Sequence, residues 1–137
     1  MANRRPQLFE QERVTMTLDH ASAAATATVK MWKVPAGRRF RLTRASYINP
    51  TGLAGSATDA FVGTVQKGAT VMATLFNTET DNGGATLTAD TFVEGTLSAT
   101  AANQWGAADD VISFVATEVG TTATLPAGRV VIEGYLY

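Results

Sequence analysis

The chain contains no cysteine among its 137 residues, and it has one histidine and four prolines. Without cysteine, disulfides and thiolate metal sites are excluded, and assembly in a reducing cytosol is expected. No apolar run approaches the ~18 residues of a membrane-spanning helix. The opening residues show no apolar core of a secretory signal, so we expect neither a signal peptide nor a membrane partner.

Charged residues are also scarce, at 17% of the chain. Long surface helices normally carry many Glu and Lys, whereas this sequence is rich in Ala, Thr and Gly. A hydrophobic content of 45% argues against disorder, and the length suits one domain with a single core. The composition therefore predicts an all-β globular domain.

Alternation of apolar and polar residues recurs along the chain and predicts short strands with two different faces. It places Val14, Met16 and Leu18 on one face of the first strand and Phe40 and Leu42 on one face of the third. The expected strands cover 14–18, 23–34, 38–48, 59–66, 70–76, 85–89, 91–100, 110–118 and 129–137, separated by turn-forming segments. One alternative is a helix in "DHASAAATATVKMW", because alanine is the best helix former.

Eight or nine short strands predict a β-sandwich, and a jelly roll is the commonest version with this strand number. We assign residues 13–137 to this sandwich. Residues 1–12 are polar and contain a proline, and we assign them to an extended N-terminal arm. Leu8 and Phe9 are the expected anchors of the arm if a partner's groove receives it.

The tetrapeptide Pro-Ala-Gly-Arg occurs twice, at 35–38 and 126–129, each time before an apolar stretch. Proline suits a strand end, and the following Gly37 or Gly128 can adopt the positive φ that a turn needs. We expect two loops that each begin a strand. The two strands are either equivalent elements of facing sheets or unrelated turns with chance similarity.

Two polar segments invite a functional interpretation, but the residues favour ordinary structure. The residue types of a hydrolytic triad occur close together as Asp19, His20 and Ser22. Neighbouring strand residues point to opposite faces, so Asp19 cannot easily orient His20. Asn77–Gly84 resembles a calcium loop but lacks its glycine and its final glutamate, which favours a hairpin tip. With no nucleotide-binding or metalloprotease motif either, we expect no enzyme, no cofactor and no metal site.

Charge is distributed unevenly. Residues 1–44 hold nine of the eleven basic residues and three acids, whereas residues 45–137 hold two basic and nine acidic residues. Three interpretations remain open. Early basic strands could pair with late acids such as Glu94 and Glu133, the basic and acidic faces of neighbouring subunits could meet, or the basic part could bind nucleic acid. A pI near 5.7 disfavours direct nucleic-acid binding.

The stretches "WKVPAGRRFRLTRASYINPTGLA" and "VISFVATEVGTTATLPAGRVVIEGYLY" resemble virion structural proteins of tailed bacteriophages. More narrowly, they are similar to the small jelly-roll decoration, or cement, proteins on the capsid exterior. The similar parts are the strand start after Val34, the "ASYINPTG" strand and turn, and the final "DDVISF…LPAGRVV". They cover the chain from Trp32 onward, with a gap across 61–109.

The resemblance implies a non-enzymatic protein that binds the major capsid protein, reinforces the outer shell and forms a homotrimer. It implies assembly in the host cytoplasm and a final location on the capsid exterior. Together with the arm and the basic run, it gives the expected partner-binding residues: Arg4, Arg5, Leu8, Phe9, Arg38, Arg39, Arg41 and Trp105. Two alternatives are a tail, neck or fibre component and a carbohydrate-binding module that uses Trp105 in "ANQWGAADD".

Overall fold

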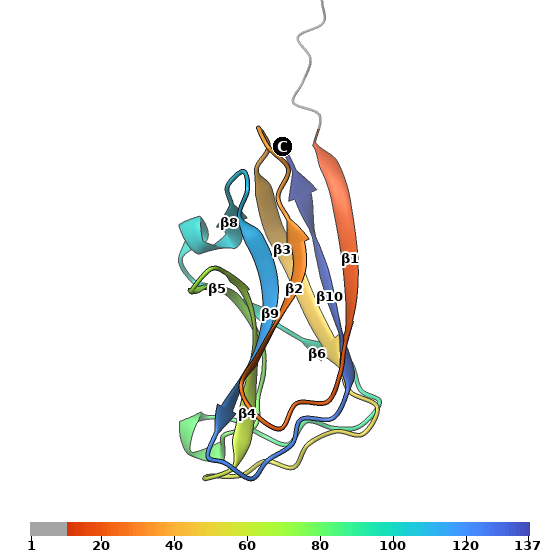
Figure 1. Ribbon diagram of the computed structural model, residues 1–137, viewed down its shortest axis with the longest axis vertical. Helices are drawn as coiled ribbons and strands as arrows, with labels where there is room; N and C mark the ends of the chain where they lie inside the picture. Colours follow the sequence, from red (N-terminus) through yellow and green to blue (C-terminus); the bar gives the residue numbers. More distant parts are fainter. Residues whose placement is uncertain (1–10) are drawn as a thin grey trace, which may run out of the picture.

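The computed structural model describes residues 11–137 and shows an all-β protein built from two antiparallel sheets packed face to face (Figure 1). The β1 sheet has the order β1-β10-β3-β6, with β8 also paired to β3. Its strands are β1 (Glu12–His20), β10 (Gly128–Leu136), β3 (Phe40–Ile48), β6 (Val93–Glu94) and β8 (Trp105–Gly106). The predicted β-sandwich is confirmed, whereas its jelly-roll topology stays a prediction.

The β2 sheet has the order β2-β9-β4-β5-β7. Its strands are β2 (Ala27–Lys33), β9 (Val111–Val119), β4 (Ala60–Lys67), β5 (Thr70–Asn77) and β7 (Thr96–Leu97). Two 3₁₀ turns, η1 (Thr80–Asn82) and η2 (Ala101–Gln104), lie in the connections. The segment considered as a possible helix instead contains the end of β1 and most of β2.

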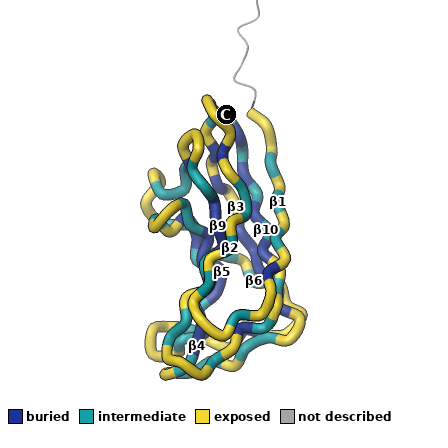
Figure 2. The backbone as a smooth tube through the Cα atoms, in the orientation of Figure 1, coloured by how far each residue is buried: buried dark blue, intermediate teal, exposed yellow. Residues whose placement is uncertain are grey.

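The core lies between the two sheets, where the buried positions of the tube cluster (Figure 2). Alternation explains which side chains enter it, because successive strand residues point to opposite faces. Phe40 and Leu42 of β3 are fully buried while Arg41 between them is exposed, as predicted. The largest fully buried side chains are Tyr47, Phe40, Phe61, Phe114, Leu42, Met72, Leu75, Ile112, Leu125 and Ile132.

Two expected strands in the middle of the chain are wrong. Residues 85–89 form no strand: Leu87 alone of them is buried, and its backbone exchanges two hydrogen bonds with Leu53 in an isolated bridge. Residues 91–100 form two short strands that belong to different sheets, β6 beside β3 and β7 beside β5. The chain crosses between the sheets at Gly95, whose N–H donates to the Ala45 carbonyl at 2.7 Å.

The first Pro-Ala-Gly-Arg segment lies in a loop that leads into β3, whereas the second starts in a loop and its Gly128 and Arg129 already belong to β10; the two strands are not equivalent elements of facing sheets. β3 and β10 are antiparallel neighbours in the β1 sheet, with Arg129 opposite Ile48 and Leu136 opposite Phe40. Gly37 has the predicted positive φ of 74°. Gly128 does not; it is the first residue of β10, and its lack of a side chain has a different cause, given below.

Candidate functional site

Of the eight expected partner-binding residues, Arg4, Arg5, Leu8 and Phe9 lie outside the described residues. The other four are brought together at the end of the sandwich where β10 ends and β1 begins (Figure 1). Tyr137 joins them there. We call Arg38, Arg39, Arg41, Trp105 and Tyr137 the Arg–Trp cluster.

Local structure positions the arginines of this cluster. The β2–β3 connection turns at Pro35–Gly37, where the Arg38 N–H donates to the Pro35 carbonyl at 3.2 Å. The backbone of Arg39 then exchanges two hydrogen bonds with Tyr137, of 3.1 and 2.8 Å. Arg41 lies on the outward-facing side of β3, because its neighbours Phe40 and Leu42 fill the core.

Trp105 reaches the cluster from a distant part of the chain. The short strand β8 pairs with the start of β3, which sets Trp105 directly opposite Arg41. The Lys67 ammonium group fixes the approach to β8 by donating to the carbonyls of Ala102, at 3.2 Å, and of Trp105. A segment 64 residues after Arg41 is thereby held beside it.

The cluster stacks cations on aromatic rings. The guanidinium carbon of Arg39 lies 4.9 Å from the centre of the Trp105 ring, and that of Arg41 lies 5.6 Å away. The Tyr137 ring is 5.2 Å from the Trp105 ring, tilted by 43°. Cation–π contacts at these distances hold a guanidinium in place without neutralising its charge.

Charge pairing differs among the three arginines. Arg38 donates to the Tyr137 carbonyl at 2.9 Å and approaches the Glu12 carboxylate at 3.9 Å. Within residues 11–137, neither Arg39 nor Arg41 has a carboxylate within ion-pair distance. Among the described residues, two exposed and oriented positive charges without a paired carboxylate therefore border one half-buried tryptophan.

The cluster continues as a row across the outer face of the β1 sheet. Register places Arg13 opposite Tyr135, Tyr135 opposite Arg41, and Arg41 opposite Trp105. Neither Arg13 nor Tyr135 is among the eight expected partner-binding residues. Both occupy outward-facing positions of alternating strands, but only the strand order makes them neighbours of Arg41.

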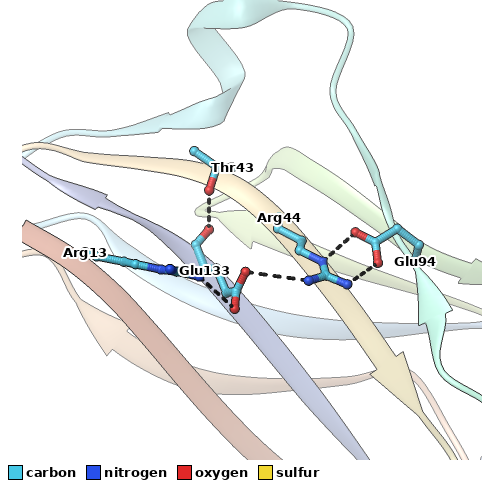
Figure 3. Close-up of polar contacts among 5 residues, drawn as sticks. All are labelled: Arg13, Thr43, Arg44, Glu94 and Glu133. Carbon is cyan, nitrogen blue, oxygen red and sulfur yellow. Dashed lines mark hydrogen bonds and ion pairs between the residues drawn. The ribbon is translucent and has the colours of Figure 1, made fainter.

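An ion-pair network covers the middle of the same face (Figure 3). Arg44 makes two hydrogen bonds with Glu94, at 2.8 and 3.0 Å, and approaches Glu133 at 3.9 Å. Glu133 also lies 3.6 Å from Arg13. Early basic residues thus pair with Glu94 and Glu133, which confirms the first of the three interpretations of charge for these residues; Lys33 with Asp109, 3.1 Å apart, follows the same pattern.

The β1 sheet also borders two hollows, one at the end of β1 and one within the ion-pair network. One, of about 420 Å³, is lined by Asp19, His20, Ile48, Pro50, Ala127, Gly128 and Arg129. The other, of about 290 Å³, is lined by Arg44, Ser46, Phe92, Glu94, Val131 and Glu133. Phe92 is 64% exposed, which is unusual for so large an apolar side chain.

His20 belongs to a buried network rather than to a triad. Its Nδ1 lies 2.8 Å from the Ala21 carbonyl, which can only accept, so Nδ1 carries the proton and Nε2 accepts from the Tyr47 hydroxyl at 2.7 Å. Asp19 points away and forms a two-bond pair with Arg129, at 2.7 and 3.2 Å. The prediction that Asp19 does not orient His20 is confirmed.

Burial shifts the titration of both rings in this network. Desolvation lowers the pKa of His20, although the Ala21 carbonyl and the Asp19 charge oppose the shift. Desolvation also raises the pKa of Tyr47 to about 12, against the effect of its hydrogen bond from Asn49. The neutral forms of both groups are therefore the ones that the folded structure favours.

The segment that resembles a calcium loop folds on itself. The Asn77 side chain accepts from the Glu79 N–H at 2.8 Å and donates to the Asn82 carbonyl at 3.0 Å, and Gly83 turns with a φ of 76°. No group of three or more His, Asp or Glu side chains that could hold a metal ion occurs within 11–137.

The described part of the chain also contains no helix with the length and apolar character needed to cross a bilayer. In comparisons with known proteins, no family model, no curated protein and no solved structure matches the chain.

Proposed function

We propose that the protein is a bacteriophage virion structural protein that decorates the capsid and binds its outer surface through the Arg–Trp cluster. The observation that carries the proposal is the convergence of Arg39, Arg41 and Trp105 at one end of the sandwich. The identity of the partner, the major capsid protein, comes from the resemblance of the Val-Pro-Ala-Gly-Arg and "ASYINPTG" segments to decoration proteins.

The chemistry of the cluster suits an acidic protein surface. A guanidinium group can bind a carboxylate through two parallel hydrogen bonds, and Arg39 and Arg41 are free of carboxylates within residues 11–137. Their stacking on Trp105 means that little side-chain freedom is lost on binding. Arginine and tryptophan are also the residue types that dominate binding energy at protein interfaces.

The position of the cluster suits a shell. It lies at one narrow end of an elongated sandwich, so a protein bound by this end would stand on the capsid and leave both sheets accessible (Figure 1). Binding adds interface area across the shell without any chemical step. Repetition of one such contact around a symmetric particle multiplies a modest stabilisation.

The carbohydrate-binding alternative gains no support from the geometry of Trp105. A sugar ring would stack on the face of the indole. The guanidinium groups of Arg39 and Arg41 lie over this ring, and Tyr137 packs against it. The protein's own side chains therefore already occupy positions at the ring where a sugar would stack.

Charge reversal tests the proposal. Shells assembled from the major capsid protein encoded in the same genome would be mixed with the full chain and sedimented, and bound protein measured against concentration. We expect Arg39→Glu or Arg41→Glu to weaken binding about tenfold or more, and high salt to weaken the unmodified protein. Lys30→Glu is the matched control, because Lys30 is an exposed basic residue of β2 outside the cluster.

Equal binding by all three variants, with thermal unfolding unchanged, would remove the cluster from the proposal. Absence of binding by the unmodified chain to shells would contradict the decoration function itself. Binding to isolated tails in that case would identify the tail alternative.

A further inference from the structure

The outer edges of the two sheets differ in how they are protected against pairing with another chain. β6, β7 and β8 are each two residues long. β2 carries Lys30 and Lys33, and its register with β9 shifts between Lys30 and Trp32. Very short strands, lysines and bulges are the devices by which proteins block exposed edges.

β1 has none of these devices. It is nine residues long, contains neither proline nor lysine, and pairs with β10 without a register shift from Glu12 to His20. It lies at the margin of the molecule (Figure 1), with side chains that alternate between exposed and half-buried up to the buried His20 (Figure 2). Within residues 11–137, no strand pairs with its other edge. Its free backbone groups form a regular ladder that is open to another strand.

The sequence of β1 is complementary to itself when read in reverse. If two copies pair antiparallel about a two-fold axis at Met16, each side chain faces its counterpart on the same face of the sheet. Between residues 13 and 19, the pairs are Arg13 with Asp19, Val14 with Leu18, Thr15 with Thr17, and Met16 with Met16. Opposite charges, threonine pairs and apolar pairs are the cross-strand combinations that stabilise antiparallel sheets.

The faces agree as well. Arg13, Thr15, Thr17 and Asp19 are exposed on the outer face, whereas Val14, Met16 and Leu18 are half-buried against the core. A slip by one residue would turn the apolar set outward. A slip by two residues would set Arg13 opposite Thr17 and lose both charge pairs.

We propose that β1 is a self-association edge through which two copies of this chain form an antiparallel pair centred on Met16. The occupant is a second copy because the charges complement each other only in this symmetric arrangement. In the dimer, the Asp19–Arg129 ion pair of one copy lies next to the Arg13–Glu133 ion pair of the other copy. Positive and negative side chains then alternate along one line across the joined outer faces of the two β1 sheets.

This inference does not depend on the proposed capsid contact, because the pairing uses the free edge of β1 and does not use Arg39, Arg41 or Trp105. β1 touches the cluster region only at its start, through Glu12 near Arg38 and Arg13 opposite Tyr135. One strand edge buries less than the ~1,600 Å² of a standard interface, so we expect reversible, concentration-dependent association. Sedimentation velocity of the full chain over a concentration series would show a monomer and a species of twice its mass.

Charge reversal at both ends of β1 gives a specific test. Arg13→Asp alone sets two carboxylates against each other at both ends of the pair, and Asp19→Arg alone sets two guanidinium groups there. For each variant alone, the dissociation constant of self-association should therefore rise at least about tenfold. In an equimolar mixture of the two variants, each end again joins a carboxylate of one copy to a guanidinium of the other, and a dimer should be restored. Lys30→Glu on the other edge strand should leave association unchanged.

A monomer at every concentration would overturn the proposal, as would a dimer that either variant leaves intact. A trimer insensitive to both substitutions would overturn it in favour of the assembly that the resemblance implies. If a variant fails to fold, hydrogen exchange of the unmodified chain decides. Amides of β1 that point away from β10 should exchange more slowly at high concentration, and unchanged exchange would overturn the pairing.

Discussion

Gly37 and Gly128 occupy the same place in two copies of Pro-Ala-Gly-Arg, yet the structure requires glycine for different reasons. Gly37 has a φ of 74°, and nothing lies within 4 Å of the position that a Cβ would take. Gly128 has no positive φ, but a Cβ there would collide with the Tyr47 hydroxyl and lie 3.0 Å from His20 Nε2. One glycine provides a backbone conformation and the other provides space.

This difference predicts unequal costs for the same substitution. Gly37→Ala should destabilise the protein by about 1 kcal/mol, the cost of a left-handed conformation for a residue with a side chain. Gly128→Ala should cost about 3 kcal/mol, since it overpacks the core and disturbs the buried His20–Tyr47 hydrogen bond. Urea unfolding measures both. Equal costs would contradict the packing of Tyr47 against β10.

The sequence alone shows that both positions favour glycine, but it cannot separate the two causes. Positive φ follows from a local turn, and Pro35 with Gly37 is enough to predict it. The contact at Gly128 depends on Tyr47 and His20, which lie 81 and 108 residues earlier in the chain. Only the strand order of the β1 sheet brings them together.

Among the elements, the long strands were predictable and the short ones were not. β1, β10 and the first half of β3 alternate between more buried and more exposed residues, so alternation identifies them. β4, β5 and β9 are buried over consecutive residues, and apolar runs bounded by turn-forming segments identify them instead. β6, β7 and β8 are two residues long, too short for a pattern, and they are recognisable only by their pairing with β3 or β5. The predicted strand at 85–89 fails because Leu87 is its one buried residue, which a single bridge to Leu53 accommodates.

His20 and Tyr47 join β1 to β3, although β10 lies between these two strands in the sheet. Because burial lowers the pKa of His20, the unfolded chain binds a proton at higher pH than the folded protein does. The stability that the neutral histidine contributes is complete above the unfolded pKa of about 6.5. It is lost as the pH falls from there through the folded pKa.

We therefore expect the free energy of unfolding to decrease between pH 7.5 and pH 5.5, roughly one unit on either side of the histidine pKa. The lowered pKa values of Asp19, Asp59 and Glu94 act at lower pH, where carboxylates begin to protonate. Denaturant unfolding at a series of pH values measures the effect, and His20→Gln should abolish it in this range. If the free energy of unfolding of His20→Gln still falls over this pH range, a group other than His20 causes the decrease.

In the whole molecule, the uneven charge of the sequence gives rise to two surfaces that differ in net charge. The ion pairs of Arg13 and Arg44 with Glu133 and Glu94 neutralise the middle of the β1 sheet. Arg39 and Arg41 remain uncompensated within residues 11–137 and collect around Trp105. The protein thus has a neutral face and a basic end.

The sequence predicted the basic part of this end but not its shape. Arg38, Arg39 and Arg41 lie within four residues of one another, so their grouping needs no tertiary structure. The sequence indicates a binding role for Trp105 in "ANQWGAADD", whereas its position beside the arginines depends on β8 pairing with β3. Tyr135 and Arg13 join the row through the order β1-β10-β3.

The most direct test of the proposed function is a cryo-electron microscopy map of the virion that the chain's own genome encodes. We predict a β-sandwich on the outer surface of the capsid, oriented with Trp105 and Tyr137 against the shell and the opposite end of the β1 sheet pointing away. A sandwich that contacts the shell elsewhere, with Trp105 facing solvent, would contradict the assignment of the Arg–Trp cluster. A capsid that lacks the chain would contradict the function.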